Sequence, residues 1–375
     1  MRNEKSGTLN AICPYFTMFP LDFPQKIISE YHIPGTAVLD PFCGRGTTMY
    51  AARRNHIFSV GIDSSPVAAC VAEAKLVNTT PEKIVRVARG ILRSTIVPEP
   101  PKGEFWEYAF DKDVLSNICI LRKSLLRNCS TPERKALRAI IMGALHGPLS
   151  KNGTSYFSNQ CPRTYAPKPN YAVKFWKTRH MMPPQVDMIS IISARAHRYF
   201  FNEDTIGRGS VLQGDSRSRN MLERVSRRLE KAGQNVGLVV TSPPYYGMCT
   251  YIPDQWLRNW FVGGPEKVDY CTAFQISHKG IDTFSKDLET VWRRCAKLAV
   301  PNAVLAIRFG AINDRAVDPE TIIRKSLDKT PWRVLDIHGA GISPPKSRQA
   351  NSFIAGSKPK KQIEEIDVIA RLDKR

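Results

Sequence analysis

Short apolar runs alternate with helical segments near the start of the chain, and this alternation constrains the fold more than any other feature. Thr36–Asp40 (TAVLD) and Ile57–Ile62 (IFSVGI) are predicted buried strands, and each leads into a predicted helix. Further candidate strands follow at Ser210–Gln213, Val236–Val240 and Ala303–Phe309. Strands that alternate with helices build a mostly parallel sheet that is covered by helices on both faces. The sequence therefore predicts an α/β fold.

The alternation is interrupted in the middle of the chain, where we expect helices and irregular segments but no buried strand. The stretch from Thr80 to Ser210 contains 21 Lys and Arg against 10 Asp and Glu, and the 375-residue chain has a net charge of +21. We expect residues 1–79 and 210–375 to form one α/β domain, and residues 80–209 to form a basic, mainly helical insertion. A surface this basic attracts polyanions, although charge does not choose among DNA, RNA and acidic membranes.

The nine cysteines and seven histidines indicate no metal site, because no two cysteines are spaced as CxxC and the histidines do not group with them. An odd number of cysteines also argues against a secreted disulfide scaffold. No apolar stretch is long enough to cross a bilayer, and the first residues do not have the pattern of a signal segment. We therefore expect a cytoplasmic protein without a membrane or metal partner.

A glycine-rich loop, Asp40–Thr48 (DPFCGRGTT), follows the first predicted strand and opens a helix. Open α/β sheets bind ligands at this end of their strands, and glycines let a ligand approach the backbone. A dinucleotide loop would need a third glycine where Met49 stands, and a phosphate-binding loop would need a lysine after its last glycine. The acidic strand end instead suits a cationic ligand such as a sulfonium. Asp63 and Asp215 follow the next two strands, placed to accept hydrogen bonds from ribose hydroxyls and an adenine amino group.

A second loop, Thr241–Tyr245 (TSPPY), directly follows the apolar strand Val236–Val240. Two consecutive prolines fix the backbone and leave carbonyl oxygens as acceptors. The loop thus offers a hydroxyl, carbonyls and an aromatic ring, which together suit the exocyclic amino group of a base. Acceptors that hold both N–H groups favour a tetrahedral nitrogen, whose lone pair can attack a methyl group, while the ring stacks on a base turned out of the duplex.

The two loops together resemble the amino-methylating DNA methyltransferases, which act on cytosine N4 or adenine N6. The resemblance implies a Rossmann-like methyltransferase fold with a seven-stranded sheet, and it makes the α/β portions the catalytic domain. It also implies S-adenosyl-L-methionine as cofactor and double-stranded DNA as substrate. The residues expected at the cofactor are Asp40, Pro41, Phe42, Gly44, Gly46, Thr47, Asp63 and Asp215. The residues expected at the target base are Ser242, Pro243, Pro244 and Tyr245.

Several alternatives remain open. Serine before the prolines is associated in this family more often with cytosine N4, so we favour that atom over adenine N6. Methylation of cytosine C5 is disfavoured because the chain has no Pro-Cys dipeptide that would supply the cysteine nucleophile. An RNA base methyltransferase and a non-catalytic nucleic-acid-binding subunit on a methyltransferase scaffold are the other candidates. A role in restriction–modification, with a cognate restriction endonuclease as partner, is a further expectation from the resemblance.

Overall fold

The computed structural model describes residues 8–15, 19–148, 155–159, 165–201, 203–247, 251–270, 275–278, 280–310, 318–342 and 364–373. By packing, the chain divides into two compact units. The sheet unit comprises residues 17–65, 208–249 and 272–375. The helical unit comprises residues 1–16, 66–207 and 250–271.

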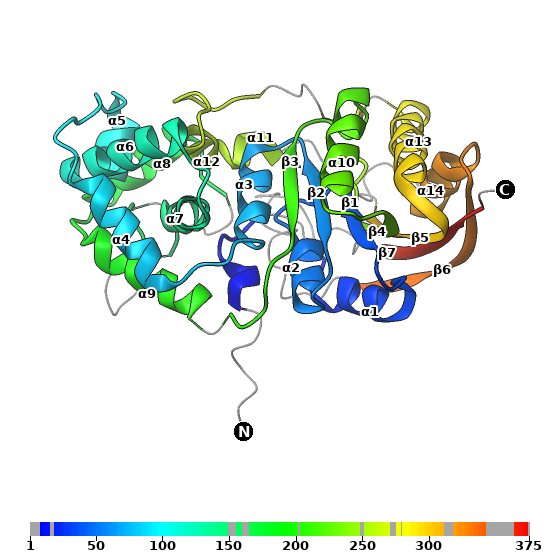
Figure 1. The fold of residues 1–375 in the computed structure, drawn as a ribbon. Coiled ribbons are helices and arrows are strands. Elements are labelled where there is room, and N and C mark those ends of the chain that lie inside the picture. The colour runs from blue at the N-terminus through cyan, green and yellow to red at the C-terminus, as the bar shows by residue number, and fades with distance from the viewer. Residues whose placement is uncertain are drawn as a thin grey trace. The chain divides into compact units, whose positions relative to one another are not determined.

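The sheet unit is built on a seven-stranded sheet with the order β3-β2-β1-β4-β5-β7-β6 (Figure 1). All neighbouring strands pair in parallel except β7, which is antiparallel to both β5 and β6. The strand order reverses direction between β1 and β4, which is where doubly wound sheets bind their ligands. The strands are β1 (Ala37–Asp40), β2 (Ser59–Asp63), β3 (Gly209–Gln213), β4 (Val236–Thr241), β5 (Ala299–Gly310), β6 (Trp332–Ile342) and β7 (Glu364–Leu372).

Helices cover both faces of this sheet, because successive strand residues point to opposite sides. In β4, Val236 and Val239 pack into one apolar cluster, whereas Leu238 and Val240 pack into the other. The first cluster includes residues of three helices, α10 (Arg219–Lys231), α13 (Ile281–Leu298) and α14 (Pro319–Leu327). The second includes residues of α1 (Asp22–Tyr31) and α2 (Thr47–Arg54). The expected Rossmann-like architecture, a mostly parallel seven-stranded sheet between helical layers, is confirmed.

The described part of the other unit is helical, and α7 (Pro132–Ala144) lies at its centre. Thr131 caps the start of α7, since its side chain accepts a hydrogen bond from the Arg134 N–H, and Pro132 is the first residue of the helix. It contacts α3, α4 and α9. The elements are η1 (Thr8–Ala11), α3 (Pro66–Ala74), α4 (Pro81–Leu92), α5 (Glu104–Ala109), α6 (Lys112–Arg127), α7, α8 (Pro169–Thr178), α9 (Met188–Phe200), α11 (Tyr251–Asp254) and α12 (Trp256–Phe261).

The division by packing differs from the boundaries at residues 79/80 and 209/210 that the sequence suggests. Helix α3 and residues 250–271 pack with the helical unit. In α3 the reason is visible, because Glu73 forms ion pairs with Lys135 and Arg138 of α7 at 3.0 and 2.8 Å. Almost all of α3 is apolar and buried, so its sequence does not reveal which neighbour it covers.

Candidate cofactor and catalytic site

The two loops singled out in the sequence lie at the same end of neighbouring strands. Strands β1 and β4 pair in parallel, with Leu39 opposite Val239. The glycine-rich loop therefore leaves the sheet beside the diproline loop, although about 200 residues separate them in the chain. Both loops belong to the sheet unit.

The Asp40 carboxylate joins these two loops. Its Oδ2 accepts a hydrogen bond from Thr48 Oγ1 at 2.6 Å, and its Oδ1 accepts one from Thr241 Oγ1 at 2.7 Å. The Phe42 N–H also donates to Oδ1 at 3.0 Å. Asp40 is fully buried, and burial raises its pKa to about 6 although these hydrogen bonds oppose the shift. The side chain thus lies beneath the loops and holds them together instead of facing a ligand.

The glycine-rich turn has a backbone conformation that favours glycine. Gly44 and Gly46 have φ values of 49° and 80°, and Gly46 directly precedes α2. The Gly46 N–H donates to the Cys43 carbonyl at 2.7 Å, which closes the turn. A Cβ on Gly44 would have no atom within 4 Å, so the backbone is open on that side. A ligand can therefore approach the turn closely there.

Asp63, at the end of β2, supports the glycine-rich turn from the neighbouring strand. Its Oδ2 accepts the Gly44 N–H at 2.9 Å and its Oδ1 accepts the Ser65 N–H at 2.8 Å. Burial raises the pKa of Asp63 to about 6, against the effect of these two hydrogen bonds. Because a carboxylate oxygen can accept more than one hydrogen bond, Asp63 retains acceptor capacity for a ligand.

Asp215, after β3, is held by an arginine that no sequence motif marked as a site residue. Arg217 contacts both carboxylate oxygens of Asp215, with Nη2 to Oδ2 at 2.8 Å and Nε to Oδ1 at 3.0 Å. Its Nη1 also binds Asp287 of α13 at 2.7 Å, and its Nη2 donates to the Gln275 carbonyl at 3.1 Å. Asp287 in turn accepts the Ser277 N–H at 3.0 Å. Arg217 therefore ties the end of β3 to α13 and to the segment before it.

The diproline loop ends in a tyrosine whose position is fixed at two points. The Tyr245 hydroxyl donates to Glu365 Oε1 of β7 at 2.6 Å, and its ring packs edge-on against Phe309 with centroids 6.1 Å apart. Tyr245 and Ser242 are half-buried, whereas Pro243 is buried. Glu365 was not foreseen, because nothing near it in the sequence marks it as a partner of a loop 120 residues earlier.

The remaining expected residues surround this centre. Pro41 accepts a hydrogen bond from Ser216 Oγ at 2.5 Å through its carbonyl, and the Phe42 ring packs edge-on against Trp292. Thr47 is buried in the first turn of α2, and Pro244 is half-buried. All twelve expected residues thus lie in the sheet unit, around the ends of β1 to β4.

Two classes of feature are absent from the described ranges. There, no group of three His, Cys, Asp or Glu side chains is arranged to hold a metal ion. Among the described helices, none combines the length and the apolar character needed to cross a membrane.

Comparison with known proteins bears on the part of the chain that holds the glycine-rich loop. Residues 1–73 match the family model described as DNA methylase, of the N6 and N4 type. Over these residues, which hold the glycine-rich loop, the resemblance to the amino-methylating DNA methyltransferases is confirmed. The Type II methyltransferase M.MjaII of Methanocaldococcus jannaschii is 29% identical over 92 residues, which are 24% of this chain and 17% of that relative. The family match supports S-adenosyl-L-methionine as the cofactor.

Solved structures give only distant likenesses to this methylase-like chain. TrmN from Thermus thermophilus is 10% identical, with a TM-score of 0.35 over 98% of this chain and 53% of TrmN. A SAM-dependent methyltransferase from Methanosarcina mazei is 9% identical, with a TM-score of 0.33 over 94% of this chain and 97% of that protein. Scores this low add nothing to the fold, which the strand order establishes directly.

Proposed function

We propose that this protein transfers a methyl group from S-adenosyl-L-methionine to the exocyclic amino group of a flipped base in double-stranded DNA, with cytosine N4 favoured over adenine N6. One observation carries the proposal: the buried Asp40 carboxylate binds Thr48 of the glycine-rich loop and Thr241 of the diproline loop. This arrangement sets a candidate cofactor loop and a candidate amine-binding loop side by side.

The residues around the glycine-rich turn fit the cofactor. The open side of Gly44 allows close approach of the methionine part, and Asp63 keeps acceptor capacity for the ribose hydroxyls. Asp215 would accept a hydrogen bond from the adenine amino group, and Arg217 holds its carboxylate in place. Asp40 would not contact the cofactor but would hold the glycine-rich turn in place through its hydrogen bonds with Phe42 and Thr48. When bound, the cofactor supplies an activated methyl group on a sulfonium.

The diproline loop would activate the amine of the target base. Ser242 Oγ and the Pro243 carbonyl would each accept one of its N–H groups, which leaves the nitrogen lone pair free to attack. The amine would take the methyl group that the cofactor supplies, with the electron pair of the CH3–S bond left on sulfur, and would lose one proton to solvent. Tyr245, anchored on Glu365 and Phe309, would stack on the base.

The choice of cytosine N4 rests on Ser242 before the prolines, a position at which adenine N6 enzymes of this family more often have Asp or Asn.

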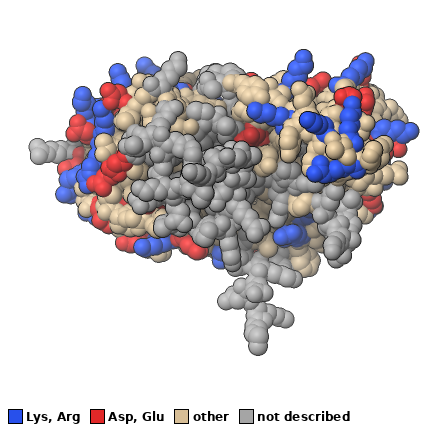
Figure 2. All heavy atoms as spheres, turned by 180° about the vertical axis from the view of Figure 1, so that it is seen from behind, with Lys and Arg blue, Asp and Glu red and all other residues tan. Residues whose placement is uncertain are grey.

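The basic surface, including the helical unit, would bind the DNA. Figure 2 shows Lys and Arg gathered at the upper right, on the side of the helical unit. We propose a cytoplasmic enzyme of restriction–modification, with a cognate restriction endonuclease as its partner.

A labelled-cofactor assay tests the proposed function. The protein is incubated with methyl-labelled S-adenosyl-L-methionine and separate pools of double-stranded DNA and structured RNA. We expect label in the DNA pool. Label in RNA alone would favour the RNA base methyltransferase, and cofactor or DNA binding without any transfer would favour a non-catalytic subunit.

Cofactor affinity should depend on pH through Asp63. Because its pKa is about 6, Asp63 is ionised in only about a tenth of the molecules at pH 5. The ribose hydroxyls need the ionised carboxylate as their acceptor. We expect the cofactor Kd from calorimetry to rise about tenfold between pH 7.5 and pH 5. Asp63→Asn should flatten most of this change. A wild-type Kd equal at both pH values would rule out the ribose contact.

Tyr245 and Glu365 should act as one unit in methyl transfer. Tyr245→Phe and Glu365→Ala each remove the hydrogen bond that orients the ring, so each should lower kcat about tenfold. The double variant should be no worse than either single variant. Asp336→Ala, which removes an exposed carboxylate from the adjacent strand β6, is the control and should be neutral. Additive losses in the double variant would show that Glu365 does not work through Tyr245.

A further inference from the structure

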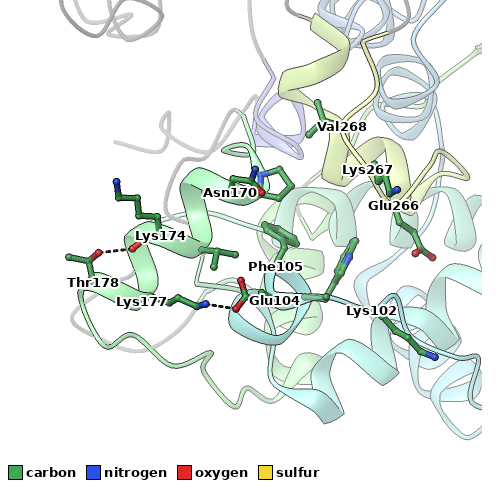
Figure 3. Close-up of a pocket in the computed structure, with 14 residues that line it drawn as sticks. Lys102, Glu104, Phe105, Asn170, Lys174, Lys177, Thr178, Glu266, Lys267 and Val268 are labelled. Atoms are coloured by element: carbon green, nitrogen blue, oxygen red, sulfur yellow. Dashed lines mark hydrogen bonds and ion pairs between the residues drawn. The ribbon is translucent and has the colours of Figure 1, made fainter.

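A pocket of about 700 Å³ lies within the helical unit, away from the residues of the candidate methylation site in the chain. Its walls come from α5, from α8 and from residues 266–268, which follow α12 (Figure 3). All of its lining residues belong to the helical unit. The volume falls within the usual range of ligand sites in proteins.

Lysines dominate the polar lining of this pocket. Lys102, Lys174, Lys177 and Lys267 all line it, and they come from three separate segments of the chain. Figure 3 shows Lys174 and Lys177 on α8, with Lys102 and Lys267 on the opposite side. Lys174 and Lys267 are exposed, so their ammonium groups are accessible to a ligand.

The two carboxylates of the lining leave this positive charge largely uncompensated. Glu104 forms an ion pair with Lys177 across the pocket. Burial lowers the pKa of Arg122 and the charge of Glu266 opposes that shift, so Glu266 has a basic neighbour of its own. Neither Lys174 nor Lys267 forms an ion pair with a carboxylate in the described ranges.

Lys102 adds to the uncompensated positive charge of the pocket. Its amino group lies 2.7 Å from Glu99, but the two side chains are 85% and 75% exposed, and water screens such a pair strongly. A polyanion that displaces Glu99 from Lys102 therefore breaks an ion pair that contributes little free energy. The pocket as a whole presents more positive than negative charge to a ligand.

Part of the lining is apolar and rigid. Phe105, Trp106 and Val173 line it and are all buried. The Phe105 ring packs against Trp176 and Trp256 with centroids 5.7 and 4.7 Å apart, which fixes the wall. An apolar wall between segments that carry lysines suits a sugar flanked by phosphates.

We propose that this pocket binds the sugar–phosphate backbone of a DNA strand, with phosphates on Lys174 and Lys267 and the sugar toward the Phe105 and Val173 wall. This inference rests on the proposed function in taking DNA as the substrate. It assigns the helical unit a defined DNA contact in addition to general attraction by charge. Two phosphate contacts of this kind release counterions and make binding depend on salt.

The test compares DNA binding by the full-length protein and two variants. Lys174→Gln/Lys267→Gln removes the two pocket charges, and Lys83→Gln/Lys231→Gln removes two exposed charges on α4 and α10 outside the pocket. The Kd for a labelled mixed-sequence duplex is measured by fluorescence anisotropy at several salt concentrations. The pocket variant should bind roughly 10- to 50-fold more weakly at 0.1 M salt, and the slope of log K against log salt should fall by about 2. The control variant should change much less.

Equal losses in the two variants would overturn the proposal, because they would show that only total charge matters. Wild-type affinity in the pocket variant would overturn it as well and would leave the pocket to a different ligand, such as an acidic protein. Methyl transfer is measured separately on the same preparations. A protein that binds DNA through these lysines but transfers no methyl group would contradict the proposed function and support the pocket assignment.

Discussion

Replacing Ser242 by alanine should lower kcat for methyl transfer about hundredfold while the cofactor Kd stays close to the wild-type value. The hydroxyl would hold one N–H of the target amine in the transition state, and loss of one preorganised hydrogen bond to a reacting group costs about 10²- to 10³-fold in rate. Ser242 is half-buried and follows Thr241, whose hydroxyl is bound to Asp40, so the backbone that carries the Ser242 side chain is anchored next to the sheet.

The conservative variant separates this role from a structural one. Ser242→Thr keeps the hydroxyl and should retain most of the activity, whereas Ser242→Ala should not. Single-turnover kinetics with labelled cofactor give the rate, and calorimetry gives the cofactor Kd. If Ser242→Ala transfers methyl groups at the wild-type rate, Ser242 has no part in amine activation.

Asp40→Ala should lower the free energy of unfolding by about 3 kcal/mol. The change strips an acceptor from the Thr48 and Thr241 hydroxyls and from the Phe42 N–H, and a buried polar group left unpaired costs about 1 to 3 kcal/mol. Relief of the cost of burying the Asp40 charge offsets part of that loss. Urea unfolding followed by circular dichroism measures the difference.

Asp40→Asn is the matched control for this experiment. It keeps the shape and one acceptor oxygen, so its loss of stability should be clearly smaller than that of Asp40→Ala. Because Asp40 joins both loops, the alanine variant should also lose cofactor affinity and transfer rate together. An alanine variant as stable as the wild type would mean that the three hydrogen bonds do not hold the loops.

Much of the sheet could be predicted from the sequence, since each of its buried strands is an apolar run that ends at a turn. Strand β4 was expected at Val236–Val240 and extends one residue further, to Thr241. Helix α3 was harder to place, because its apolar residues surround the helix and its partners on α7 are distant in sequence. The buried side of an amphipathic helix can be predicted from its periodicity, whereas the neighbour of a helix that is apolar almost all round cannot.

The sequence predicted the loops of the candidate site but not the hydrogen bonds and ion pairs that connect them. The sequence marked Asp40 as a strand end, and only the fold reveals that Thr241 donates to it from 201 residues away. Arg217 stands two residues after Asp215, a spacing that could have suggested the ion pair. Glu365 had no such signal, because its contact with Tyr245 depends on the antiparallel pairing that brings the start of β7 to the end of β5.

The identity of the methylated atom tests the account most directly. Wild-type protein is incubated with S-adenosyl-L-methionine and unmethylated genomic DNA, the DNA is digested to nucleosides, and the products are separated by liquid chromatography with mass spectrometry. We predict N4-methyldeoxycytidine; N6-methyldeoxyadenosine would keep the chemistry of the diproline loop and change only the base. A methyl group on carbon 5 of cytosine, or no methylated nucleoside at all, would contradict the claim that this loop makes a nitrogen the methyl acceptor.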